Sequence, residues 1–218
     1  MPEAVVTRVL YLHGFASSAR STKAAYFQER LQALGVVFEC PDFNEPDFRS
    51  LTITRMLGQL ERDLSRVAGP STVIGSSLGG ALAVVAAARF APQIDRLVLL
   101  APAVMFAKRG HHLLPPDRIE EWRRKGALPF QHYGYGGERL LDYHFYEDSL
   151  QYDPFDARFE QPTLVFQGLR DASVDHRTVE AFARARRNVA LSLLDDDHQL
   201  TASLPRIWRE TAAFLGVR

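Results

Sequence analysis

Short apolar runs rich in valine, leucine and isoleucine alternate along this chain with longer stretches whose apolar residues recur at helical spacing. Such alternation predicts βαβ units, which build a mostly parallel sheet with right-handed crossovers. Because polar residues rarely interrupt the runs, we expect helices to cover both faces of the sheet. The sequence therefore predicts a three-layer α/β fold with six strands, at residues 5–12, 36–40, 71–74, 94–100, 163–166 and 189–194.

Five helices are predicted between and after these strands. Ser21 is placed to cap the first helix, and Gly35 stands where a helix often ends in a left-handed residue. The residues expected on the buried face of this helix are Ala24, Phe27, Leu31 and Leu34. The other helices are expected at residues 53–64, 78–90, 175–187 and 204–215.

The alternation stops between residues 103 and 160, which divides the chain into a core (1–102 and 161–218) and an insertion (103–160). The insertion holds 11 of the 23 aromatic residues and 4 of the 7 histidines. Its middle, Leu128 to Tyr146, is compatible with a hairpin around Gly134–Gly137. A long segment without sheet pattern is usually a functional loop or lid, so we interpret it as a cap. The alternative is an insertion that merely encloses a small aromatic core of its own.

Four aromatic residues of the insertion are candidates for covering a site and contacting its ligand. They are Trp122, Tyr133, Tyr143 and Phe145.

Charge and cysteine content exclude several classes of protein. The 26 basic and 26 acidic residues cancel, which argues against nucleic-acid binding by bulk electrostatics. The single cysteine, Cys40, excludes an intrachain disulfide framework or a cysteine zinc site and suits a reducing compartment. Residues 1–8 do not resemble a signal peptide, and no apolar stretch is long enough to span a membrane. We expect a cytoplasmic monomer or homodimer that binds no membrane and no metal.

The strongest chemical motif is Gly75-Ser76-Ser77-Leu78-Gly79, which matches Gly-x-Ser-x-Gly. It follows a predicted strand and opens a predicted helix, which is the context required for a nucleophile at a sharp strand-to-helix turn. Such a turn lifts the Ser77 hydroxyl above the sheet edge and requires small neighbours. It also directs the Leu78 N–H and the helix N-terminus at the same place, where they favour developing negative charge. The alternative is a glycine-rich turn that lets a helix pack closely on a sheet.

A serine hydroxyl needs a general base, and the expected chain order is serine, acid, histidine. Among the later histidines only His198 lies in a loop directly after a core strand, so it is the predicted base. His176 is interpreted as a surface residue in the first turn of a helix. The remaining histidines of the insertion have no specified register; they are His111, His112, His132 and His144.

Asp171 is the predicted third member, because it follows the strand at residues 163–166. Its competitor, Asp175, stands where a helix N-cap is wanted. The three aspartates before His198 are expected to face solvent or to raise the histidine pKa; they are Asp195, Asp196 and Asp197.

A second oxyanion donor is expected from the loop after the first strand, His13-Gly14-Phe15. Gly14 permits close backbone approach, so the Phe15 N–H is paired with the Leu78 N–H in this prediction. His13 is expected to hold the loop by a side-chain hydrogen bond rather than to act as a base.

These motifs together resemble an α/β-hydrolase. The segments at residues 13–18 and 74–80 are similar to the small bacterial serine esterases of the YqiA type. The resemblance implies a carboxylesterase for small acyl esters with Ser77, Asp171 and His198 as its triad and no cofactor. The sequence departs from this pattern in two ways. It begins at what would be the third strand of the larger hydrolases, so we expect a sheet without their first two strands, and its cap is larger than a minimal member needs.

The same triad serves other bonds, so a thioesterase, a lactonase and a C–C bond hydrolase remain alternatives. A non-catalytic binding module on this fold is a further alternative, although such proteins commonly lack a triad member and all three positions are filled here.

Overall fold

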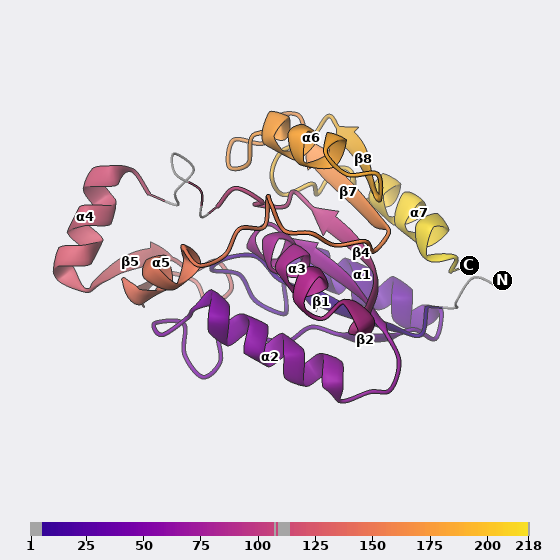
Figure 1. The fold of residues 1–218 in the computed structure, drawn as a ribbon, viewed down its shortest axis with the longest axis horizontal. Helices are drawn as coiled ribbons and strands as arrows, with labels where there is room; N and C mark the ends of the chain where they lie inside the picture. The colour runs from indigo at the N-terminus through magenta and orange to yellow at the C-terminus, as the bar shows by residue number, and fades with distance from the viewer. Residues whose placement is uncertain (1–5, 107, 109–113, 218) are drawn as a thin grey trace.

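The computed structural model describes residues 6–106, 108 and 114–217, and its centre is one parallel sheet (Figure 1). The sheet has six strands in the order β2-β1-β3-β4-β7-β8, and every neighbouring pair is parallel. The predicted six-stranded α/β architecture is therefore confirmed. The strands are β1 (Arg8–Leu12), β2 (Val37–Glu39), β3 (Ser71–Ser76), β4 (Ile94–Leu100), β7 (Thr163–Gly168) and β8 (Val189–Leu194).

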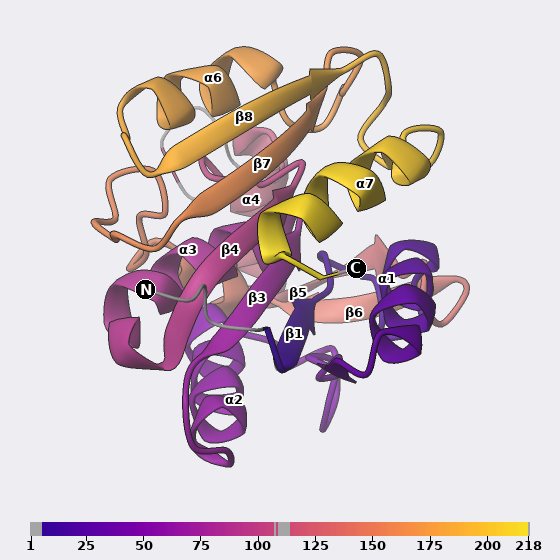
Figure 2. The same ribbon diagram turned by 90° about the vertical axis from the view of Figure 1, so that its right-hand side faces the viewer.

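Helices cover both faces of the sheet, as Figure 2 shows from the side. Helices α1 (Thr22–Ala33) and α7 (Leu204–Leu215) pack on one face through a cluster that includes Phe27 and Ile207. Helices α2 (Ile53–Ser65), α3 (Leu78–Arg89) and α6 (His176–Arg184) pack on the other through a cluster that includes Leu60 and Phe182. Successive residues along the strands belong alternately to the two clusters. The apolar strands are therefore buried on both faces of the sheet, as predicted.

Two strands extend further than predicted. Gly75 and Ser76 continue β3 by pairing with Leu99 and Leu100 of β4, and Gly168 continues β7 by pairing with Leu194. A glycine weakens a strand but does not end it when a neighbouring backbone supplies the ladder.

The expectation for Leu34 was wrong. Helix α1 ends at Ala33, Gly35 follows with φ of +76°, and the Leu34 side chain is 38% exposed. Leu34 therefore lies just beyond the end of the helix, and its side chain does not join the buried face. The predicted Ser21 cap and left-handed Gly35 are both present.

Within the described residues, segment 103–160 adds no strand to the main sheet and contributes a separate two-stranded sheet. It contains α4 (Pro116–Lys125), β5 (Ala127–Gln131), β6 (Glu138–Asp142) and α5 (His144–Ser149). The strands β5 and β6 pair antiparallel, which confirms the predicted hairpin. Figure 1 shows α4, β5 and α5 to one side of the sheet and its helices.

This insertion does not enclose a separate core. Trp122, Leu141 and Phe145 belong to the same buried cluster as the residues of α2 and α3. Polar contacts add to the attachment: Asp142 accepts a hydrogen bond from Arg49 Nε at 2.8 Å, and Asp148 accepts one from Thr54 N at 2.9 Å. Among the described residues, no helix combines the length and apolar character needed to cross a bilayer.

Candidate active site

Ser77 occupies the sharp turn between β3 and α3 and has a φ of +53°. For a non-glycine residue this left-handed value is strained and persists only where neighbouring groups fix it. The Ser77 N–H donates to the Leu100 carbonyl at 2.9 Å, and the Ser77 carbonyl accepts from Gly80 N at 2.9 Å and Ala103 N at 3.1 Å. The strained residue is thus held from both sides by the backbone of β4, α3 and the segment after β4.

The glycines around Ser77 are required by close backbone packing. A Cβ at Gly75 would overlap the backbone of Gly79, and a Cβ at Gly79 would overlap the Leu12 carbonyl of β1. The small residues predicted from the motif therefore let α3 begin directly against the end of the sheet.

Ser77, His198 and Asp171 form a continuous hydrogen-bonded chain at the carboxyl ends of β3, β8 and β7. The Ser77 hydroxyl donates to His198 Nε2 at 3.1 Å, and His198 Nδ1 donates to Asp171 Oδ2 at 2.8 Å. A carboxylate can only accept, so Nδ1 carries the proton shared with Asp171 and Nε2 is the nitrogen left to accept from Ser77. The nitrogen that faces the serine is then a free base.

The Asp171 carboxylate is completely buried and accepts four hydrogen bonds. Its Oδ1 accepts from Ser173 N and Val174 N, both at 2.8 Å. Its Oδ2 accepts from Gln167 Nε2 at 2.9 Å in addition to His198. Burial by itself would raise the pKa of Asp171, but the hydrogen bonds from His198, Val174 and Gln167 outweigh it and lower the pKa. The carboxylate is therefore ionised at neutral pH.

The competing aspartates have other contacts. Asp175 caps α6 by accepting from Arg177 N at 2.9 Å, as predicted, and also lies on the wall of the cavity beside Ser77. Asp195 is exposed and pairs with Arg170. The expectation that Asp196 faces solvent was wrong: it is buried and accepts from Asp197 N and Ser203 N, both at 2.8 Å. Asp196 therefore shapes the loop that carries His198.

The other histidines lie away from the Ser77 hydroxyl or have other partners. His176 pairs with Glu180 at 2.9 Å and His144 with Glu147 at 3.6 Å, both within single helices. His13 accepts from Phe43 N at 3.1 Å and donates from Nδ1 to the Gly14 carbonyl at 2.9 Å, so it holds its loop as predicted. His111 and His112 lie outside the described residues.

Phe15 and Leu78, the two predicted oxyanion donors, border the same cavity as Ser77. Leu78 is the first residue of α3, and the first N–H groups of a helix have no acceptor within it. Phe15 follows β1 in the loop that His13 holds. The part of the chain that the structure describes contains no group of three or more His, Cys, Asp or Glu side chains arranged to hold a metal ion.

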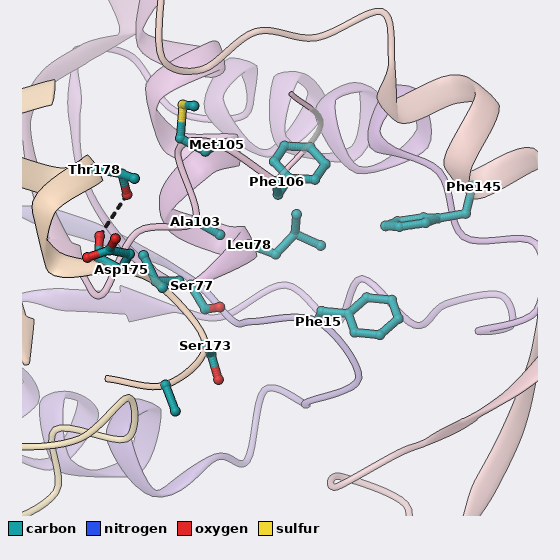
Figure 3. Close-up of a pocket in the computed structure, with 12 residues that line it drawn as sticks. Phe15, Ser77, Leu78, Ala103, Met105, Phe106, Phe145, Ser173, Asp175 and Thr178 are labelled. Carbon is teal, nitrogen blue, oxygen red and sulfur yellow. Dashed lines mark hydrogen bonds between the residues drawn. The ribbon is translucent and has the colours of Figure 1, made fainter. Parts of the chain in front are cut away.

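The cavity has a volume of about 480 Å³, and its aromatic side chains lie together on one side of Ser77 (Figure 3). On one side of Ser77 lie Leu78 and the rings of Phe15, Phe106 and Phe145, and on the other lie Asp175 and Thr178. The remaining lining residues are Ala103, Met105, Ala172, Ser173 and Val174.

Of the four aromatic residues predicted to contact a ligand, Phe145 borders this cavity. Trp122 is buried instead, donating from Nε1 to the Leu141 carbonyl at 2.8 Å and packing on Phe130. The Tyr133 side chain is 78% exposed. Tyr143 packs between Trp122 and Tyr146. These three residues build the insertion rather than the described wall of the cavity.

Sequence reasoning missed Met105, Phe106, Val174 and Thr178 as lining residues. Their position gives a signal, because Met105 and Phe106 follow β4 and the other two follow β7. Segments after the carboxyl ends of parallel strands are where such sheets place their sites.

Lys23 of α1 contacts the loop that carries His198, because its Nζ donates to the Gln199 carbonyl at 3.1 Å. Burial lowers the pKa of Lys23 from 10.5 to about 8, against the attraction of Asp171, Asp197 and Asp196. Below pH 8 the folded protein must bury this charge. Between pH 8 and 10.5 the folded protein has lost the proton while the unfolded chain retains it, so folding stability rises with pH.

Lys23→Met removes this pH-dependent term. We expect the unfolding free energy of the variant, relative to that of wild type, to be about 2 kcal/mol lower at pH 10 than at pH 7. Urea unfolding at the two pH values measures it, with Lys125→Met at an exposed site as the control. A difference between Lys23→Met and wild type that stays constant with pH would contradict the prediction.

A family model and several solved structures match this chain. Residues 8–215 match the family model described as Uncharacterised protein family (UPF0227). Est1E from Butyrivibrio proteoclasticus, solved with ferulic acid bound, is 21% identical with a TM-score of 0.82, covering 97% of this chain and 88% of that one. Mouse alpha/beta hydrolase domain-containing protein 10 is 21% identical with a TM-score of 0.80, covering 96% and 89%. At these identities the two structures establish a shared α/β-hydrolase fold.

One curated relative matches over part of the chain. The biotin biosynthesis bifunctional protein BioHC from Teredinibacter turnerae is 35% identical over 106 residues. The match covers 46% of this chain but only 18% of that protein.

Proposed function

The chain belongs to the uncharacterised protein family UPF0227, and for this α/β-hydrolase we propose a serine carboxylesterase activity with Ser77 as nucleophile, His198 as general base and Asp171 as the acid that orients it. The observation that carries the proposal is the chain of hydrogen bonds from Ser77 Oγ through His198 to Asp171, which begins at the wall of a cavity. A monoacylglycerol lipase from Paleococcus ferrophilus, which has the same fold at 12% identity, is consistent with it.

In the proposed acylation step, His198 Nε2 takes the hydroxyl proton as Ser77 Oγ attacks the ester carbonyl. The Phe15 and Leu78 N–H groups stabilise the tetrahedral oxyanion, aided by the N-terminus of α3. His198 then returns its proton to the leaving alcohol, and the acyl group remains on Ser77. Water, deprotonated by His198, releases the acid by the same route. Asp171 stays ionised throughout and stabilises the imidazolium form of His198.

The side chains on the two sides of Ser77 favour small, uncharged acyl esters as substrates. Leu78 and the rings of Phe15, Phe106 and Phe145 offer an apolar surface for the acyl chain. Asp175 and Thr178 offer polar groups on the opposite side of Ser77, where an alcohol group would lie. Thioesters, lactones and C–C bonds next to a ketone are the alternative substrates for the same triad.

Two measurements on the wild-type protein test the proposal. A fluorophosphonate probe should label Ser77, as located by peptide mass spectrometry, and a panel of nitrophenyl esters, acyl thioesters and lactones should show the highest kcat/KM for the esters. Folded protein that neither labels nor hydrolyses any substrate would favour a binding module instead. Faster turnover of thioesters or lactones would transfer the mechanism to that bond.

Phe106→Ala is expected to shift the preference toward longer acyl chains. Phe106 is only partly buried on the apolar side of the cavity, so its truncation lengthens that side without emptying the core. The ratio of kcat/KM for nitrophenyl octanoate to that for the butyrate should rise about tenfold. Tyr133→Ala, which removes an exposed ring of the insertion, should leave the ratio at the wild-type value. An unchanged ratio in Phe106→Ala would show that the acyl chain lies elsewhere.

A further inference from the structure

The loop after β1 has three carbonyl groups that are each bound by a donor. The Gly14 carbonyl accepts from His13 Nδ1 at 2.9 Å. The Ala16 carbonyl accepts from Tyr133 N at 2.8 Å, and the Ser17 carbonyl accepts from Asn44 Nδ2 at 2.9 Å. Ala16 itself has a φ of +51°, a strained value that needs such fixation.

These contacts decide where the loop's N–H groups point. The Gly14 carbonyl and the Phe15 N–H belong to one planar trans peptide unit, so they point in opposite directions. A carbonyl held against His13 therefore aims the Phe15 N–H toward the other side. The Phe15 ring is fixed as well, because it packs edge-to-face on Phe130 of β5 with ring centroids 5.5 Å apart.

Asn44 is in turn held by the insertion. It is buried, and its Oδ1 accepts a hydrogen bond from His132 Nε2 at 3.1 Å. His132 is fully buried and accepts from Tyr135 N through Nδ1 at 3.1 Å, which leaves Nε2 as the donor. Burial and the nearby His13 and Arg139 lower the pKa of His132, in keeping with a neutral ring. The turn of the hairpin thus reaches the loop both directly, through Tyr133 N, and through Asn44.

The contact between turn and loop is also tight. A Cβ at Gly134 would lie 2.7 Å from Ser18 Cβ and 3.1 Å from the Ser17 carbonyl carbon. At Gly136, two residues along the same turn, a Cβ would meet nothing within 4 Å.

Resting on the proposed function, we propose that residues 132–135, in the turn between β5 and β6, act with Asn44 as a positioning element that holds the Phe15 N–H in place for the oxyanion. The turn contributes no group to the reacting atoms. It acts through the Ala16–Ser17 peptide. Tyr133 N binds the Ala16 carbonyl, and the Ser17 N–H of the same peptide donates to the Gly14 carbonyl at 3.3 Å, whose own peptide carries the Phe15 N–H.

The paired variants Gly134→Ala and Gly136→Ala test this proposal. Gly134→Ala should push the turn from the loop and lower kcat about 10- to 100-fold while KM changes less than about twofold, since displacing one oxyanion donor affects the transition state. Its affinity for a trifluoromethyl ketone, which forms a tetrahedral adduct on the serine, should fall by the same factor. Gly136→Ala strains a φ of +66° and should lower the melting temperature, yet leave kcat and inhibitor affinity unchanged.

If Gly134→Ala folds poorly, His132→Gln and His132→Leu provide the second pair. The glutamine amide can still donate to Asn44 Oδ1 and should retain kcat within about threefold, whereas leucine cannot donate and should lower kcat about tenfold or more. Folded Gly134→Ala or His132→Leu with wild-type kcat and inhibitor affinity would overturn the proposal, and so would equal kcat losses in both members of a pair. A wild-type protein that neither labels with fluorophosphonate nor hydrolyses esters would instead contradict the proposed function.

Discussion

Ser77→Ala is expected to lower kcat for nitrophenyl ester hydrolysis about 10⁴- to 10⁶-fold. The variant removes the atom that forms the acyl-enzyme, while His198 and the oxyanion donors stay in place and sustain only slow attack by water. Alanine retains the Cβ of Ser77, so the strained turn and its backbone hydrogen bonds to Leu100, Gly80 and Ala103 are preserved. The loss should therefore appear without a change in fold.

Ser173→Ala is the matched control for this experiment. Ser173 is a second serine on the wall of the same cavity, and its backbone N–H, which the substitution keeps, is the group that binds Asp171. We expect kcat within about threefold of wild type and full fluorophosphonate labelling, whereas Ser77→Ala should not label. A Ser77→Ala protein with the wild-type rate would remove the basis of the proposed mechanism.

Asp171→Asn is expected to lower kcat about 10⁴-fold near neutral pH. The Oδ1 position accepts from two backbone N–H groups, whereas Oδ2 accepts from the side chains of Gln167 and His198, so we expect the amide nitrogen of the variant at the Oδ2 position. It would then face His198 Nδ1, which has to become an acceptor, and the ring proton moves to Nε2. In that tautomer His198 cannot accept the proton of Ser77.

Asp175→Asn separates this effect from general electrostatics. Asp175 is the other carboxylate at the carboxyl end of β7 and borders the cavity, but its side chain caps α6 through Arg177 N. Asparagine caps helices as well as aspartate does, so kcat should change less than about fivefold. Raising the pH should partly restore Asp171→Asn, because hydroxide can take the Ser77 proton in place of His198. Equal losses in the two variants would contradict the assignment of Asp171.

The spatial meeting of Ser77, Asp171 and His198 follows from simple rules that operate on the sequence. Each residue comes directly after a strand, and the carboxyl ends of parallel strands lie at one edge of a sheet. The glycines of the elbow are equally readable, because a backbone packed this closely against α3 excludes a Cβ. Local residue spacing and the order of the strands are therefore sufficient to predict most of the fold and the placement of these three side chains.

The predictions that failed concern residues whose environment depends on packing between segments distant in the sequence. Asp196 is buried because it serves Ser203 N and Asp197 N in a loop whose path no periodicity describes. Trp122 is buried because the insertion joins the main core, and Tyr133 is exposed because its backbone rather than its ring makes the contact with Ala16. The clustering of aromatic residues identified the insertion as a candidate cap. It did not distinguish the rings that line the cavity from the rings that pack inside the insertion.

The shared core of the insertion and the sheet bears on how such a domain diverges. The segment that supplies Phe106 and Phe145 to the cavity also supplies Trp122 to the main core and the turn that contacts the loop after β1. Exchanging the whole segment for a relative's would alter selectivity, stability and catalytic geometry at once. Changes of substrate range should therefore accumulate as single substitutions on the cavity wall, and the insertion should be inherited as an integral part of the domain rather than as an exchangeable module.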